Sequence, residues 1–144
     1  MNKIIEYINK IEFDMSIKFP PVYKRFLIEE IKDSETYEIT NKKHETLYLY
    51  NYSDLIERNE TYDIQQVEPD YFLIGQDGDL GYFIYVGSAK ESDTIFSVDL
   101  GALGAMEFSK EADDIYLLSV WLIVIFNRML NIASRYCNGI FIEV

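Results

Sequence analysis

Residues 71–86, with the sequence YFLIGQDGDLGYFIYV, decide the fold. The segment begins with 71–74 and ends with 82–86, two runs rich in the aromatic and β-branched residues that are typical of strands. The stretch 75–81 between them contains three glycines and two aspartates, a composition typical of turns. The segment therefore predicts two strands joined by a glycine-acid turn in which glycine supplies positive φ.

Other segments also have the composition of strands. Residues 36–40 and 46–50 flank the polar segment 41–45, which indicates a hairpin with a long loop. Residues 94–98 follow a polar turn and predict a further strand. We also expect an edge strand over 140–144.

Helices are predicted at both ends of the chain. Pro21 begins a helix that ends near 32–34, and Ser53 has the residue type of an N-cap for a short helix over 54–59. A helix after 112–114 has apolar residues on every side up to Phe126, which predicts a long buried helix. The N-terminal segment predicts an amphipathic helix, because isoleucines recur at helical spacing, at Ile4, Ile5, Ile8 and Ile11.

Together these elements predict one α+β domain over residues 1–144, with a central, mostly antiparallel sheet flanked by N-terminal helices and a long buried C-terminal helix. The 144 residues, 49% of them hydrophobic, are enough for a core without metal or disulfide support. The apolar run 115–126 is shorter than the roughly 20 residues of a membrane span, and 1–10 lacks the apolar stretch of a signal peptide. We expect no membrane segment and a cytoplasmic location.

Charge is the most unusual feature of the composition. The chain has 25 Asp and Glu against 13 Lys and Arg, a formal net charge of -12. Binding to nucleic acid requires a basic stripe, and the one local basic cluster is Lys42, Lys43 and His44. We therefore expect no nucleic-acid binding. An acidic surface attracts basic proteins, although it also serves solubility alone.

The motifs that carry enzyme chemistry are weak in this chain. The glycines of 75–81 are followed by a strand, whereas a phosphate-binding loop opens onto a helix. Asp77 and Asp79 have the spacing that opens a calcium loop, but Ser88 stands where that loop needs glutamate. His44 and Cys137 are the only histidine and cysteine. We expect no enzyme activity, no cofactor and no metal.

The sequence favours a protein-binding surface instead. Its 12 tyrosines suit interfaces, since each ring combines apolar area with a hydroxyl, although most could simply close the edges of the core. Tyr48, Tyr50 and Tyr52 alternate along one segment, which predicts one strand face. The candidate partner-binding residues are Asp77, Asp79, Tyr82, Tyr85 and Asp93, with Tyr48, Tyr50 and Asp99 as second choices.

The order of several motifs resembles the SUKH superfamily, also called the cell-wall assembly or glucan-synthesis regulator family. The motifs span nearly the whole chain: FPPVYKRFL at 19–27, YLYNYSDL at 48–55, FLIGQDGDLG at 72–81, IFSVD at 95–99 and ADDI at 112–115. The resemblance implies an α+β domain without catalytic residues. Bacterial members are mostly immunity proteins that neutralise a cognate toxin, often a nuclease, and eukaryotic members regulate wall synthesis.

The first hypothesis is therefore a non-catalytic immunity protein that binds a basic toxin domain through an acidic, tyrosine-rich surface. The alternative is a regulatory scaffold protein of cell-wall or glucan synthesis. A third class, a small-ligand-binding module, requires a defined apolar pocket. The oligomeric state is not predicted.

Overall fold

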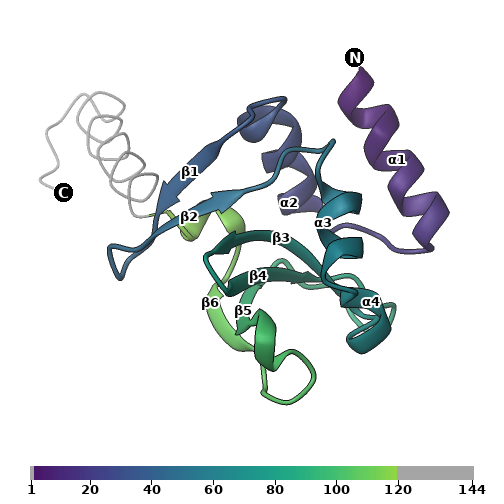
Figure 1. Ribbon diagram of the computed structural model, residues 1–144. Helices are drawn as coiled ribbons and strands as arrows, with labels where there is room; N and C mark the ends of the chain where they lie inside the picture. The colour runs from purple at the N-terminus through teal and green to yellow at the C-terminus, as the bar shows by residue number, and fades with distance from the viewer. Residues whose placement is uncertain (1, 120–144) are drawn as a thin grey trace, which may run out of the picture.

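The computed structural model describes residues 2–119, and their fold is α+β, as predicted. Its centre is a six-stranded antiparallel sheet whose strands follow one another in chain order (Figure 1). The strands are β1 Tyr37–Thr40, β2 Thr46–Leu49, β3 Tyr71–Asp77, β4 Leu80–Tyr85, β5 Ile95–Asp99 and β6 Ser109–Ala112. The helices are α1 Lys3–Met15, α2 Pro21–Phe26 with a π-helical continuation over Leu27–Ile31, α3 Leu55–Thr61 and α4 Ile64–Val67, and 3-10 turns cover Leu100–Ala102 and Ile115–Leu117.

Side chains alternate between the two faces of this sheet, so each face has its own apolar cluster. One face, here called the helix face, packs against α1, α2 and the π-helical turn; its buried residues include Ile8, Phe26, Phe72, Ile74, Tyr82 and Ile84. The other face, here called the loop face, packs against α4 and the segment 100–108; its buried residues are Ile64, Leu73, Phe83 and Val98. The continuous apolar runs 71–74 and 82–86 therefore contribute side chains to both packed layers.

The β3–β4 hairpin is tighter than the sequence predicts. The strands extend to Asp77 and from Leu80, which are Cα partners, so only Gly78 and Asp79 form the turn. Gly78 has a φ of 58°, which confirms the predicted need for glycine at positive φ. Gly75 has a different role: a Cβ there would lie 2.3 Å from the backbone oxygen of Tyr48 on β2.

A buried asparagine completes the sheet beside the first half of β3, which β2 is too short to reach. Asn59 on α3 is 1% exposed. Its amide nitrogen donates to the carbonyl of Leu73 at 2.9 Å and to that of Leu55 at 2.8 Å, and its Oδ1 accepts from the N–H of Leu73 at 2.9 Å. Because buried backbone groups must be paired, the side chain of Asn59 takes the place of a neighbouring strand beside the irregular pairing between Leu73 and Gly75.

The first two helices agree with the sequence predictions. In α1, Ile8 and Ile11 are buried, whereas Ile5 is exposed. α2 begins at Pro21, and the π-helical turn ends at Ile31, next to the predicted end.

The N-cap prediction for Ser53 is wrong. Asp54 holds the N-cap position of α3. The Ser53 hydroxyl donates to Oδ1 of Asn51 at 2.7 Å. Ser53 therefore belongs to the turn that precedes the helix, where short polar side chains compete for local hydrogen bonds.

The sequence also missed β6, and the start of the C-terminal helix differs from its prediction. Ala112 ends β6 instead of opening a helix, and Asp114 caps the 3-10 turn by accepting from the N–H of Leu117 at 3.1 Å. β6 has the sequence SKEA, which contains no β-branched or aromatic residue. The remainder of the predicted buried helix and the predicted strand 140–144 lie outside the described residues.

Candidate protein-binding surface

The β1–β2 loop and the β3–β4 turn lie at the same end of the sheet (Figure 1). β5 ends there too, because Asp99 is the Cα partner of Leu80 and the N–H of Leu100 donates to the carbonyl of Asp79 at 2.7 Å. We call this region the acidic end. Its acidic residues are Glu45, Asp77, Asp79, Asp99 and Glu111, which outnumber the two lysines of the same end, Lys42 and Lys43 of the β1–β2 loop.

The β1–β2 loop is held in shape by one buried side chain, that of Asn41. Its Oδ1 accepts from the backbone N–H groups of Lys43 and Glu45, each at 3.0 Å, and its amide nitrogen donates to Oε1 of Glu45 at 3.1 Å. His44 adopts a left-handed φ of 64° at the tip. The loop therefore presents its charged side chains from a fixed backbone, which lowers the entropy that a partner must remove on binding.

Glu111 occupies a sheltered position beside the same loop. The Ser97 hydroxyl donates to Oε2 of Glu111 at 2.6 Å, and Nζ of Lys43 lies 3.8 Å from its Oε1. The Glu111 side chain is only 9% exposed, whereas that of Lys43 is 68% exposed. The exposed Lys43 thus offsets part of the negative charge of Glu111.

The pKa of Tyr82 reflects its burial and the negative charge of the acidic end. Burial, followed by the negative charges of Glu111 and Glu45, raises the pKa of Tyr82 to about 12, with a smaller contribution from Asp77. Its hydroxyl lies 3.5 Å from the amide nitrogen of Asn41. A negative field that disfavours a further negative charge favours a positive one.

Tyr82 itself is not a contact residue, and this prediction is wrong. The side chain is 0% exposed and belongs to the apolar cluster of the helix face. It pairs with Gly75 across β3, so the alternation of β4 directs it inward. The sequence could not show which face of this hairpin is covered by the N-terminal helices.

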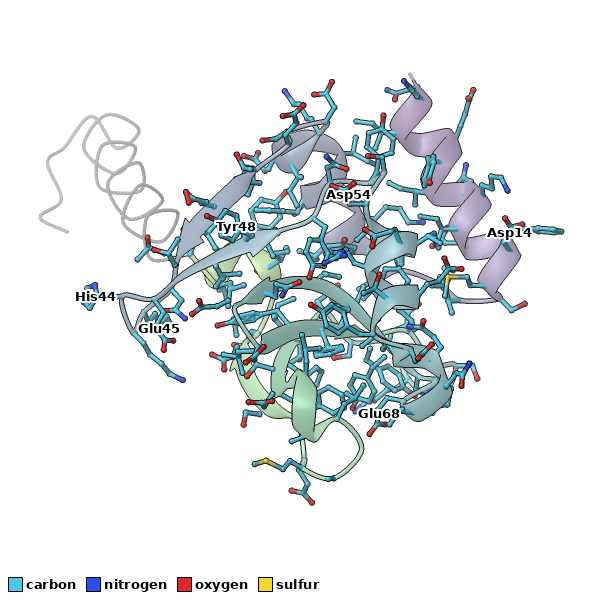
Figure 2. The ribbon with its side chains drawn as sticks, viewed as in Figure 1. Asp14, His44, Glu45, Tyr48, Asp54 and Glu68 are labelled. Atoms are coloured by element: carbon cyan, nitrogen blue, oxygen red, sulfur yellow. The ribbon has the colours of Figure 1, made fainter. Side chains whose placement is uncertain are left out.

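Tyr48 is the tyrosine that the acidic end does expose. It is 46% exposed and is the Cα partner of Gln76, next to Asp77. In Figure 2, Tyr48 lies on the β1–β2 hairpin, farther from its tip than His44 and Glu45, whereas Asp14 and Asp54 lie on other parts of the molecule. Tyr48 offers a rigid ring on the loop face of the sheet. Asp77 pairs with Leu80, which packs on the helix face, so this carboxylate lies on the opposite face at the same end.

The predicted common strand face for Tyr48, Tyr50 and Tyr52 is wrong because β2 ends at Leu49. Tyr50 is half-buried, and its hydroxyl donates to Oε1 of Gln76. Burial raises the pKa of Tyr50. Tyr52 is 7% exposed and packs in the core.

Tyr85 and Asp93 lie at the opposite end of the sheet, so the structure divides the predicted site. Tyr85 closes β4, about 17 Å from the β3–β4 turn at the usual strand rise, and is 8% exposed. Asp93 accepts from the backbone N–H of Val22 at 3.3 Å and so caps α2, whose N-cap Pro20 supplies no side-chain bond. Tyr85 lines a groove of about 580 Å³ between the α1–α2 connection and 87–92.

The structure therefore retains Asp77, Asp79, Asp99 and Tyr48 at one end of the sheet and adds Asn41, Glu45 and Glu111. Asp99 also accepts from the N–H of Gly101 at 2.7 Å, yet its side chain remains exposed. An asparagine at the start of a polar loop is a recognisable turn signal and could have identified Asn41. Glu111 reaches the site through a strand that the sequence missed.

No protein-family model matches the chain, and no curated protein matches its sequence. Among residues 2–119, no helix has both the length and the apolar character needed to cross a membrane. In the same part of the chain, histidine, cysteine and acidic side chains form no group of three or more that could hold a metal ion.

Proposed function

We propose that this protein is a non-catalytic immunity protein of the SUKH type, which acts in the cytoplasm and neutralises a basic toxin domain, such as a nuclease, by binding it. The observation that carries the proposal is the acidic end, where the exposed carboxylates of Glu45, Asp79 and Asp99 lie on the β1–β2 loop, on the β3–β4 turn and at the end of β5. A nuclease that binds an anionic substrate has a basic surface, and a rigid acidic surface competes for it.

The preformed backbone supports this function. Asn41 fixes the β1–β2 loop, and the β3–β4 turn is bonded to the end of β5 through Asp79 and Leu100. Carboxylates on ordered turns keep their spacing, which gives specificity as well as attraction. Tyr48 adds an exposed ring of the type that is enriched at the centre of protein interfaces.

The test begins with capture of partners from the cells that make the protein, with elution by a salt step and identification by mass spectrometry. The identified partner is then produced alone and together with this protein. We expect a basic toxin domain whose activity is lethal alone and blocked in an equimolar complex. A partner from wall or glucan synthesis, or a complex that leaves toxin activity intact, contradicts the proposal.

A matched pair of variants connects the effect with the acidic end. Asp77→Asn with Asp79→Asn removes two charges from the turn, and Asp33→Asn with Glu35→Gln removes two from exposed positions before β1, away from the β1–β2 loop. We expect the first pair to weaken toxin inhibition at least tenfold, the effect of about 1.4 kcal/mol, and the second to leave it unchanged. Equal effects of the two pairs contradict the assignment of the surface.

A further inference from the structure

A hollow of about 510 Å³ lies on the loop face of the sheet, between α4, β3, β5 and the segment that leads into β6. Half-buried rings of Tyr71, Phe96 and Phe108 line it, together with Glu68 and Glu107. Among residues 2–119, no lysine or arginine lines it. This site shares no residue with the acidic end.

The rings form a preordered platform. Tyr71 and Phe108 are stacked with centroids 4.0 Å apart and planes 15° apart. Phe96 meets Tyr71 edge-on at 5.7 Å, and the buried Phe83 supports Phe108 at 5.1 Å. Rings held on several sides lose little freedom when a ligand covers them.

The electrostatic environment of the platform is negative. Burial, followed by the charges of Glu68, Tyr85 and Asp70, raises the pKa of Tyr71. Lys110, the Cα partner of Phe96 on β6, is paired with Asp113 at 2.5 Å. The carboxylates of Glu68 and Glu107 form no ion pair within residues 2–119.

Two exposed apolar side chains extend the same surface. Met106 is 62% exposed and lines the hollow. Val67 is 47% exposed at the end of α4, and a Cβ at Gly104 would lie 2.5 Å from its Cγ1, so the two segments are in contact. Figure 2 shows Glu68 at the end of α4, where it follows Val67 as the C-cap residue. Apolar side chains bordered by carboxylates suit a ligand that has both an apolar part and a positive charge.

We propose that this hollow binds an arginine side chain of a partner protein, with the guanidinium against the Tyr71–Phe108 platform and beside Glu68 and Glu107. A guanidinium stacks on aromatic rings and donates to carboxylates in its own plane, whereas a lysine ammonium is a compact, strongly hydrated point charge. An apolar residue next to that arginine covers Met106 and Val67. The inference does not depend on the function proposed for the acidic end.

The probe is the dipeptide acetyl-leucyl-arginine amide, added to the full chain and followed by NMR. Its control is acetyl-leucyl-citrulline amide, which has nearly the same shape but no charge. We expect saturable shifts of the Tyr71, Phe96 and Phe108 ring signals, with at least about fivefold weaker binding of the citrulline peptide. Equal binding of the two peptides, or shifts confined to the acidic end, overturns the proposal.

Two pairs of neutralised carboxylates separate a specific site from general attraction. Glu68→Gln with Glu107→Gln changes the hollow, whereas Asp77→Asn with Asp79→Asn removes the same charge at the acidic end. We expect the first pair to weaken binding of the arginine peptide at least about fivefold and the second to weaken it less than about twofold. Equal losses overturn the proposal. Met106→Ser changes only an exposed apolar side chain, which the leucine of the peptide is expected to cover. An unchanged affinity of this variant for acetyl-leucyl-arginine amide contradicts the assigned orientation.

Discussion

Asn59 provides the most direct test of how α3 and the sheet are joined. In Asn59→Ala, the N–H and the carbonyl of Leu73 both lose their side-chain partner in the protein interior. Each buried backbone group left unpaired costs about 1–3 kcal/mol, so the sum is about 2–6 kcal/mol. The carbonyl of Leu55 belongs to α3, so the substitution removes only an additional donor from it. We therefore expect Asn59→Ala to lower the free energy of unfolding by about 3 kcal/mol.

The assay is urea unfolding followed by far-UV circular dichroism. With a slope of about 1.5 kcal/mol per molar urea, the midpoint moves down by about 2 M. Asn9→Ala is the control, because Asn9 is an exposed residue within α1 and its replacement changes stability by less than about 0.5 kcal/mol. A loss below about 1 kcal/mol for Asn59→Ala, or an equal loss for Asn9→Ala, refutes the role of Asn59 as a strand substitute.

Three further predictions use the same unfolding measurement or hydrogen exchange. Gly75→Ala places a Cβ 2.3 Å from the backbone oxygen of Tyr48 and is expected to lower the free energy of unfolding by more than about 2 kcal/mol. Gly78→Ala is expected to cost about 1 kcal/mol, because the added Cβ meets open space but φ is 58°. Equal costs contradict the close approach at Gly75. Because the folded pKa of Tyr82, about 12, lies above its ordinary value of 10.0, its contribution to stability is complete below pH 10.0 and is lost as the pH rises toward 12; the same alkaline loss in Tyr82→Phe contradicts this. Asn41→Ala frees the two loop amides that its side chain binds, so their hydrogen exchange speeds up at least about tenfold; unchanged exchange shows that the loop is ordered by other contacts.

The sequence predicted most of the sheet because its strands are apolar and separated by clear turns. The apolar runs within 71–86 and the two segments that flank 41–45 all correspond to strands. β6 was missed because its pairing with β5, and not its composition, makes it a strand. Local patterns therefore identify strands with a buried face and miss polar strands at an edge.

The candidate site was less predictable, since surface exposure depends on what covers each face. Asp77 ends β3 and Asp79 lies in the turn that follows, and turns lie at the surface, so these predictions remain. Tyr82 is only three residues from Asp79, yet it faces the N-terminal helices, and a distant contact made Asp93 a helix cap. Pairings over such sequence separations leave no local signal.

The most direct test of the central claim is the association rate of the purified protein with its identified toxin domain, measured by stopped flow over a series of salt concentrations. We predict that the rate falls steeply with salt and that Asp77→Lys with Asp79→Lys lowers it at least about tenfold at low salt, while Asp33→Asn with Glu35→Gln has little effect. A rate that is independent of salt, or one that the charge reversal leaves unchanged, would contradict binding through the acidic end.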